Sequence, residues 1–446
     1  MTDITIPAGG SLALRARVLS YGTEPIRAGE GANPFYLEDG LVVVRDGLIE
    51  AVGEASELLP TLSPALPVVD HRPALLTAGF IDPHLHMPQT QVLGSYGTEL
   101  MEWLSKYTFP EESRYGDAAV SDAATRFLMR ELLRSGTTTA VAFCTSHPQS
   151  AESYFGEAAR LGLRMVGGKV MMDRNAPPAL LDTPERAYTE SQALIQRWHG
   201  QGRLSYAISP RFAPTSTEAQ LEAAGALAKD HPDLHIQTHL SENLGEIAFV
   251  AELFPWAEDY TAVYERYGLL RRRALFGHCI HLNERERAVL ADSGSTAVFC
   301  PTSNLVLGSG LFDRDAALDA KLRVGLATDI GGGTSYSMLA TAAEAYKVLA
   351  LRGQKLPGHA AFQMMTAGNA DAIGLGDRIG QVARGFEADF AILDSTATPA
   401  LCQRMERVET LEEELFVLMT MGDDRCVVAT YAAGRKLHDR GGSAER

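Results

Sequence analysis

Gly79-Phe80-Ile81-Asp82-Pro83-His84-Leu85-His86 closes an apolar run that begins at Leu75. Side chains at positions i and i+2 of a β-strand point to the same face, so His84 and His86 would aim two imidazoles at one point. Two converging imidazoles can bind a metal ion. A single His-x-His pair is a weak signal, because such pairs are also common among core and surface histidines. The metal hypothesis therefore depends on whether matching ligands follow the ends of other strands.

Beyond this run, β-like stretches alternate with helical patterns. We expect helices at Ala118 to Arg134, at Glu218 to Lys229 and at Asn283 to Asp292. The expected strands end near His86, Phe143, Val170, Arg211, His239, His278, Cys300 and Asp329. Eight strands that alternate with helices predict a (β/α)8 barrel, whose active site forms at the C-terminal ends of the strands.

The two ends of the chain have the pattern of short antiparallel strands. Residues 41–52 predict a hairpin around Asp46-Gly47, and residues 426–437 predict a second hairpin after a strand at 388–393. We therefore expect an α/β fold with two domains. A TIM-like (β/α)8 barrel would span residues 77–379, and a small β-sandwich domain would be built from both termini, residues 1–76 and 380–446.

Composition and charge limit the classes of function. The 446 residues carry a formal net charge of −16, which disfavours binding to nucleic acids and to anionic membranes. No apolar run is long enough for a transmembrane helix, and Met1 to Thr5 show no signal-peptide pattern. The five cysteines form no CxxC pair and are expected to be reduced thiols. We therefore expect a cytoplasmic protein.

Residues suited to catalysis follow the expected strands in barrel order. They are His84 and His86 after the first strand, Arg211 and Phe212 after the fourth, His239 and Glu242 after the fifth, His278 after the sixth and Asp329 after the eighth. Three imidazoles and one carboxylate, from His84, His86, His239 and Asp329, match the ligands of a divalent metal that activates water. Glu242 lies where it could carry protons, and His278 could orient the water or polarise a substrate.

Each of these residues has a simpler explanation when it is taken alone. His239 could be a packed strand residue, Asp329 a helix N-cap, Glu242 a solvated first-turn carboxylate and Arg211 a surface charge. If the simpler explanations were all correct, these four residues would lie at the ends of barrel strands only by chance. The joint pattern therefore favours an active site.

From about Leu75 to Leu393 the chain resembles the amidohydrolase superfamily and, within it, the guanine deaminases. Gly79 to His86 is similar to the strand-one signature of the superfamily. The more specific similarities are Gln89 three residues after His86, Pro210 to Ser216, His239 to Asn243 with Glu246, Gly277 to Leu282, Cys300 to Leu305, and Thr328 to Gly333 with Ser335 to Leu339. Ala78 and Pro83 depart from the usual pattern, at positions that supply no side chain to the chemistry.

The resemblance implies hydrolytic deamination of guanine to xanthine and ammonia in purine catabolism. It implies one Zn²⁺ per subunit, held by His84, His86, His239 and Asp329. Asp329 and His278 would help to deprotonate the water that attacks C2, and Glu242 would protonate N3. The purine would contact Gln89, Arg211, Phe212, Glu242 and His278.

The resemblance also bears on metal count and assembly. Binuclear members of the superfamily carry a carboxylated lysine at the end of strand four, where this chain has Arg211, and Lys169 lies on the third strand. We therefore expect a mononuclear site. Because family members are commonly homodimers, we also expect a homodimer.

Two other interpretations compete. A related amidohydrolase could act on cytosine, an adenosine derivative or a chlorinated triazine, but Gln89 with Arg211-Phe212 argues against this. A non-enzymatic scaffold of the same superfamily would be expected to lack metal ligands, and all four are present. The choice between zinc and iron, and side activity on pterins or modified guanines, stay open.

Overall fold

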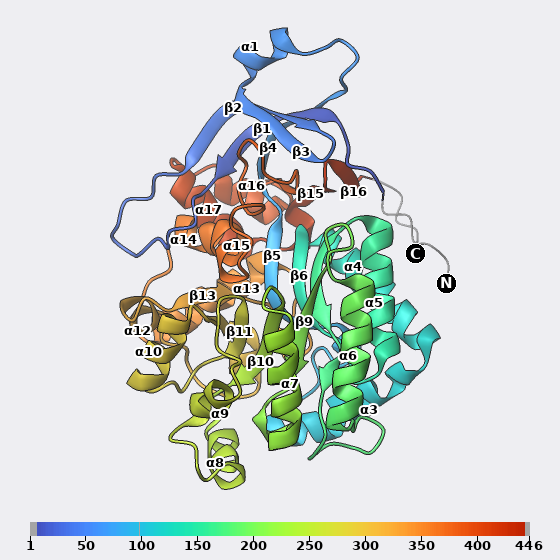
Figure 1. Ribbon diagram of the computed structural model, residues 1–446. Coiled ribbons are helices and arrows are strands. Elements are labelled where there is room, and N and C mark those ends of the chain that lie inside the picture. The colour runs from blue at the N-terminus through green and yellow to red at the C-terminus, as the bar shows by residue number, and fades with distance from the viewer. Residues whose placement is uncertain (1–6, 98, 442–446) are drawn as a thin grey trace.

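The computed structural model describes residues 7–97 and 99–441. Eight parallel strands form the barrel at the centre of its larger domain (Figure 1). Their hydrogen-bonded order is β13-β12-β11-β10-β9-β7-β6-β5, and β8 pairs with β9. The bounds are β5 Phe80–His86, β6 Thr137–Phe143, β7 Arg164–Gly168, β8 Val170–Met171, β9 Ser205–Pro210, β10 His235–Leu240, β11 Ala274–His278, β12 Thr296–Phe299 and β13 Arg323–Leu326.

The barrel closes where the segment after β13 meets β5. The backbone N–H of Asp329 donates to the carbonyl of His84 at 3.0 Å, and that of His86 donates to the carbonyl of Ile330 at 2.5 Å. The predicted (β/α)8 architecture is thus confirmed. Closure also fixes the site, because it brings the residues after the eighth strand against the first.

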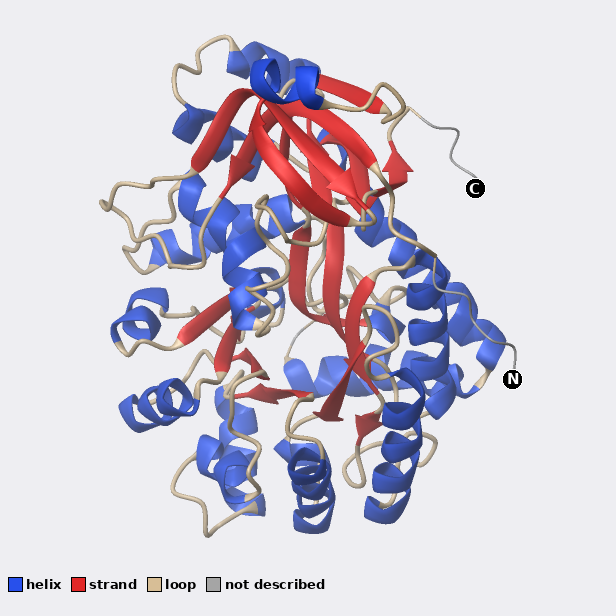
Figure 2. Cartoon of the chain, turned by 45° about the horizontal axis from the view of Figure 1, so that its top comes forward, coloured by secondary structure: helices blue, strands red, loops and turns tan. Residues whose placement is uncertain are grey.

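Most helices surround the barrel strands (Figure 2), whereas the helix at 55–58 lies on the smaller domain, at the top of Figure 1. Their bounds are α1 Ala55–Leu58, α2 Leu100–Trp103, α3 Phe109–Glu112, α4 Ala118–Arg134, α5 Pro148–Leu161, α6 Pro184–Trp198, α7 Glu218–Asp230, α8 Leu244–Leu253, α9 Tyr260–Arg266, α10 Glu284–Ser293, α11 Pro301–Val306, α12 Arg314–Asp319, α13 Met338–Leu351, α14 Gly358–Gln363, α15 Asn369–Ala372, α16 Pro399–Met405 and α17 Leu411–Met421.

The three expected helices are present as α4, α7 and α10. Helix α4 has the predicted bounds, and α7 extends one residue further, to Asp230. Helix α10 begins at Glu284 because Asn283 is its N-cap: the Asn283 side chain accepts from the N–H of Glu286, and the Glu286 side chain accepts in return. An N-cap residue has non-helical backbone angles, so it lies just outside the helix.

The two ends of the chain meet in one seven-stranded sheet, which lies above the barrel in Figure 1. Its order is β16-β15-β14-β4-β1-β2-β3. The bounds are β1 Leu12–Ser20, β2 Phe35–Arg45, β3 Leu48–Glu54, β4 Val68–Ala78, β14 Phe390–Leu393, β15 Val427–Ala432 and β16 Arg435–Asp439. The predicted small β domain from both termini is confirmed, whereas its boundaries at residues 76 and 380 stay predictions.

The first hairpin has the turn that its sequence predicts. Arg45 pairs with Leu48, so the loop consists of Asp46 and Gly47, with φ angles of 49° and 80°. Positive φ at both loop residues matches the twist of the flanking strands, and Asp-Gly adopts this conformation readily.

One continuous stretch of chain joins the two domains. Strand β4 of the small sheet ends at Ala78, and β5 of the barrel begins at Phe80. A Cβ atom on the intervening Gly79 would lie 2.2 Å from Oγ1 of Thr138, on the neighbouring barrel strand. Only glycine lets the backbone pass this closely, so Gly79 helps to place the first barrel strand and its histidines.

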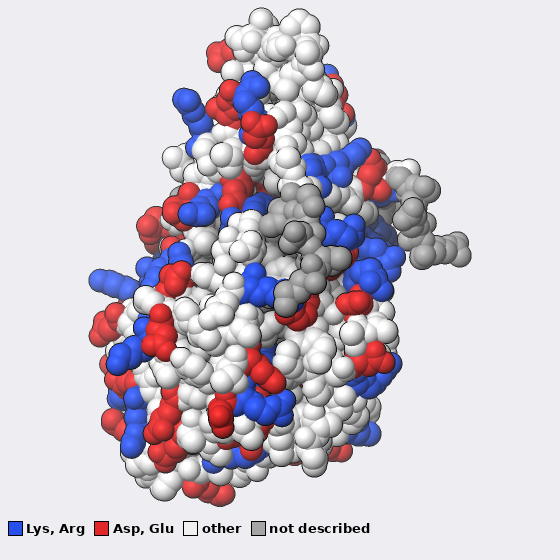
Figure 3. All heavy atoms as spheres, turned by 45° about the vertical axis from the view of Figure 1, so that its right-hand side comes forward, with Lys and Arg blue, Asp and Glu red and all other residues white. Residues whose placement is uncertain are grey.

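The surface and the helices give two further observations. On the face shown in Figure 3, basic and acidic side chains are interspersed over both domains, so that face has no continuous basic surface of the kind that phosphate backbones bind. Within the described residues, no helix is long and apolar enough to cross a membrane. The expectation that there is no signal peptide rests on Met1 to Thr5, which lie outside the described residues.

Candidate metal centre

Three histidines and an aspartate converge at the C-terminal ends of the barrel strands. His84 and His86 come from the end of β5, His239 from β10, and Asp329 from the segment after β13. All four are buried, with no more than 8% of any residue exposed. The structure therefore brings together the predicted ligand set, although Asp329 lies three residues beyond the end of its strand.

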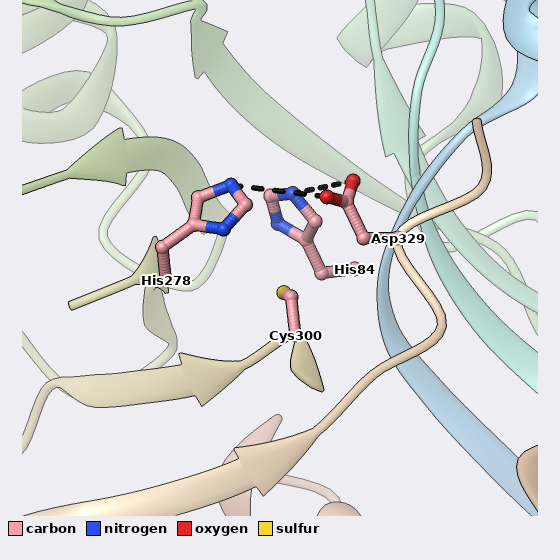
Figure 4. A group of neighbouring side chains, drawn as sticks. All are labelled: His84, His278, Cys300 and Asp329. Carbon is pink, nitrogen blue, oxygen red and sulfur yellow. Dashed lines mark ion pairs between the residues drawn. The ribbon is translucent and has the colours of Figure 1, made fainter. Parts of the chain in front are cut away.

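The donor atoms of these residues lie close enough to share one ion. Nε2 of His86 lies 3.2 Å from Nε2 of His239 and 3.4 Å from Oδ1 of Asp329. Nε2 of His84 lies 3.5 Å from the same Asp329 oxygen (Figure 4). Such spacings suit atoms that each lie about 2 Å from a common metal ion.

The protonation states of the three histidines also suit the binding of a metal cation. Nδ1 of His239 donates to the carbonyl of Arg211 at 2.6 Å, so the Nε2 of the neutral ring carries a lone pair. Nε2 of His84 is buried and makes no hydrogen bond to any described residue. Burial lowers the pKa values of His84, His86 and His239, which keeps all three rings neutral.

Asp329 supplies the negative charge of the group. Burial acts to raise its pKa, but the neighbouring imidazoles of His84 and His278 lower it to about 2. Three neutral imidazoles and one ionised carboxylate are the donor set that zinc and similar divalent metals bind. The residues present therefore fit the metal that the sequence predicted.

Cys300, directly after β12, lies beside His84, His278 and Asp329 and offers a second set of donors (Figure 4). The contacts of two members argue against that set. The Cys300 thiol donates to the carbonyl of Val298 at 3.5 Å, and burial raises its pKa well above the usual value. Both ring nitrogens of His278 face oxygen atoms, of Glu242 and Asn304. A protonated thiol, and an imidazole with both ring nitrogens directed at oxygen atoms, are poor ligands.

Glu242 and His278 form a second functional pair next to this group. Oε2 of Glu242 lies 3.4 Å from Nε2 of His278, which is 3.8 Å from Oδ2 of Asp329. Burial raises the pKa of Glu242. Burial would lower the pKa of His278, but the carboxylates of Glu242 and Asp329 raise it above its usual value. The pair can therefore hold and pass a proton beside the metal ligands.

Backbone conformation at the strand ends aims these side chains. His278 and Asp329 have φ angles of 69° and 50°, in the left-handed region that non-glycine residues rarely occupy. Such backbone is costly and persists only where surrounding contacts enforce it, often at functional sites. The left-handed conformation at Asp329 turns the chain back toward β5 after β13 has ended.

The expected substrate residues share a carboxylate that the sequence did not indicate. Oε1 of Glu112 accepts from Nε2 of Gln89 at 2.8 Å, and Nη1 of Arg211 lies 2.7 Å from Oε2 of Glu112. Oε1 of Gln89 accepts from the N–H of Gly331 at 3.2 Å. Glu112 thus ties Gln89 and Arg211 into one rigid unit.

All of the predicted site residues except His84 line one cavity. Its polar lining residues are His86, Gln89, Arg211, His239, Glu242, His278, Ser303 and Asp329, and its apolar lining residues are Leu100, Trp103, Leu104, Phe212 and Leu307. A lining of both kinds suits a heteroaromatic ring with polar edges.

Sequence reasoning missed three residues that support the site. Glu112 lies in the segment between β5 and α4, and a connection of this length is itself a sign of function. Asn304 contacts His278, and Oγ of Ser309 donates to Oε1 of Glu242 at 3.0 Å. Asn304 belongs to one of the segments that carried the family resemblance, but nothing in the sequence marked Ser309.

Comparison with known proteins agrees with this geometry. Residues 75–437 match the model of the Amidohydrolase family. The guanine deaminase of Escherichia coli K12 is 47% identical over 405 residues, which cover 91% of this chain and 92% of that protein.

Two solved structures extend the likeness to the fold. The E. coli guanine deaminase superposes with a TM-score of 0.94 at 45% identity, over 96% of this chain and 100% of that one. The guanine deaminase from C. acetobutylicum, with guanine bound in its active site, superposes with a TM-score of 0.86 at 26% identity, over 96% and 100% of the two chains.

Proposed function

The chain belongs to the amidohydrolase family and, within it, to the guanine deaminases, and on that premise we propose that it converts guanine and water into xanthine and ammonia with one zinc ion per subunit. One observation carries the proposal: three buried histidines, with Asp329 close to two of them, lie beside a carboxylate–imidazole pair. The relatives support guanine as the substrate, since the C. acetobutylicum structure has it bound in its active site.

The residues that would hold the metal are His84, His86, His239 and Asp329. A divalent ion bound there would act as a Lewis acid and lower the pKa of a coordinated water from 15.7 to about 7. Asp329 Oδ2 faces Nε2 of His278, so these two groups are placed to take up the proton that the water loses.

Glu242 is the group that we propose to protonate the purine. Burial raises the pKa of its carboxyl, which favours the protonated form that can donate to the purine. Transfer of that proton to N3 makes C2 electrophilic, and the C–O bond forms there as the N3=C2 double bond becomes single. The amino group then takes up the proton that the water lost, the C2–N bond breaks and ammonia leaves. The C2–O bond becomes double as the C2 hydroxyl returns its proton to Glu242, and xanthine remains.

Recognition of the purine would come from Gln89, Arg211 and Phe212. The amide of Gln89 has a second N–H and a second lone pair beyond its bonds to Glu112 and Gly331, and these can meet a polar edge of the ring. The guanidinium of Arg211 can donate to O6 or a ring nitrogen, and Phe212 offers an apolar wall. Adenine, with an amino group at C6, would leave these buried groups unpaired.

The proposal also covers assembly and location. We expect a homodimer in the cytoplasm, and the free state of all five cysteines is typical of a reducing compartment. Light scattering on the purified protein would measure the mass of the assembly.

The substrate assignment is tested by incubating the purified protein with guanine, adenine or cytosine. We expect guanine alone to give ammonia, in an amount equal to the xanthine seen by ultraviolet absorbance. Ammonia from cytosine or adenine, with none from guanine, would assign the chain to a different deaminase.

A further inference from the structure

A second cavity opens at the opposite end of the barrel from the metal centre. It has a volume of about 540 Å³, in the range of small-ligand sites. Arg323 and Val324, at the start of β13, line it, whereas Asp329 follows the end of the same strand. At about 3.3 Å per residue, the two sites are up to about 20 Å apart.

The loop between β1 and β2 covers one side of this cavity. That loop hangs below the small sheet on the left of Figure 1, and its residues Thr23 and Arg27 belong to the lining. It is held in place by Nε2 of Gln363, which donates to the carbonyl of Thr23 at 3.0 Å, and by Arg27, whose Nη1 lies 2.8 Å from Oδ1 of Asp319. The cavity is therefore a built feature in which both domains take part.

Arg314 is the unusual residue of the lining. It is 2% exposed, and its guanidinium makes one hydrogen bond within the described residues, from Nη2 to the carbonyl of Ile26 at 3.0 Å. Its Nε is buried and has no hydrogen-bond partner in the described part of the chain. Burial lowers the pKa of this guanidinium to about 10; the charge of Arg27 acts in the same direction, and the charges of Asp315 and Glu30 oppose it. Neither acid forms an ion pair with Arg314, so this buried cation has donors free for an anion.

The lining as a whole has more basic than acidic side chains. Its cations are Arg27, Arg314, Lys321 and Arg323, and its acids are Glu24 and Asp371. Asp371 is shared, because its two oxygens face Arg272 and Arg323. Arg27 and Arg323 are paired with Asp319 and Asp371, so Arg314 and Lys321 are the cations of the lining that have no ion pair among the described residues.

We propose that this cavity binds a small molecule through a phosphate group, with Arg314 and Lys321 as its principal contacts. A phosphate has several acceptor oxygens and up to two negative charges, so it can satisfy a planar guanidinium and a lysine ammonium at once. The volume of the cavity leaves room for the remainder of a phosphate ester the size of a sugar phosphate. The proposal is independent of the deaminase reaction, because neither residue lies near the metal centre.

Calorimetric titration of the full-length, zinc-loaded protein in phosphate-free buffer tests the proposal. The probes are inorganic phosphate, ribose 5-phosphate and ribose. We expect ribose 5-phosphate to bind and ribose not to bind. Tighter binding of ribose 5-phosphate than of inorganic phosphate would identify an ester as the ligand, and equal binding would identify the free ion.

Three variants locate the binding. Lys321→Asn removes one charge at a position with a φ of 59°, which asparagine tolerates, and Arg314→Gln keeps a donor for Ile26. Each should weaken ribose 5-phosphate binding by about tenfold, the loss expected for one charge-assisted hydrogen bond. Lys347→Gln, at a surface lysine outside the cavity, should change nothing.

The comparison of Lys321→Asn with the parent protein decides the outcome even if Arg314→Gln does not fold. Weaker phosphate binding with an unchanged rate of guanine deamination supports the site. Unchanged binding in Lys321→Asn, or no binding of either phosphate to the parent protein at millimolar concentration, overturns it.

Discussion

Arg211 and Glu112 form an ion pair that is almost completely shielded from water. Nη1 of Arg211 lies 2.7 Å from Oε2 of Glu112, and their side chains are 3% and 1% exposed. Gln89 donates to the other oxygen of the same carboxylate. Glu112 is thus a positioning residue, because it fixes two groups that we expect to meet the purine.

Replacing Glu112 tests this relationship. Glu112→Gln should raise the KM for guanine at least about tenfold, because Arg211 loses its counter-charge and can leave the site. It should also cost about 3–5 kcal/mol in the free energy of unfolding, the usual loss when one partner of a buried pair is removed. Steady-state kinetics and chemical denaturation measure the two effects.

Two comparisons separate positioning from general damage. Glu111→Gln changes the adjacent residue, whose carboxylate pairs with Arg114 instead, and should leave KM unchanged. Arg211→Ala should raise KM more than Glu112→Gln does. If Glu112→Gln lowers stability but leaves KM at the parent value, Glu112 has only a structural role.

Glu242→Gln tests the proposed proton transfer. Glutamine keeps the shape of the side chain and can still meet Ser309 and His278, but it cannot deliver a proton. We expect kcat to fall by about 10²- to 10⁴-fold, the usual contribution of general acid–base catalysis. Metal analysis should still find one equivalent of zinc. Turnover near that of the parent protein would remove Glu242 from the chemistry.

His239→Ala tests the ligand set. The variant should lose bound metal, because one of the four donors is missing and a buried space replaces it. His235→Ala is a matched control on the same strand: His235 is equally buried, but its Nε2 contacts the carbonyl of Ile373 at 2.8 Å, away from the site. The control should be less stable and still hold its metal. Full metal content in His239→Ala would contradict the ligand role.

Gly277→Ala tests whether the site depends on its packing. Gly277 pairs with His239 in the sheet, and a Cβ atom there would lie 2.5 Å from Cε1 of His84. The added methyl group should displace His84, weaken metal binding and cost about 1–3 kcal/mol in stability. Gly22→Ala adds a methyl group where no atom lies within 4 Å and should have neither effect. Normal metal affinity in Gly277→Ala would show that His84 is free to move.

The barrel could be predicted because its signals are local. Runs of apolar residues that end in His86, His239 or His278 combine strand periodicity with the residue types that bind metals and carry protons. The hairpin at Asp46-Gly47 was predictable for the same reason, since a two-residue turn depends on the turn residues themselves.

Glu112 and Arg314 could not be predicted, because their environments depend on distant parts of the chain. Phe109-Pro110-Glu111-Glu112 has the composition of an exposed helix, yet Glu112 is buried by Arg211, 99 residues away. Arg314 begins the short helix α12 and is buried by the loop between β1 and β2 of the small domain. Burial of such charges follows from closure of the barrel and docking of the small domain, which no local pattern encodes.

The most direct test is to remove the metal from the protein with a chelator, add zinc back stepwise, and measure the rate at which xanthine forms from guanine. The four-ligand site predicts no turnover without metal, a rate that rises linearly with added zinc, and a plateau at one equivalent per chain. Turnover that survives complete removal of the metal, or a plateau at two equivalents, would contradict the mononuclear mechanism.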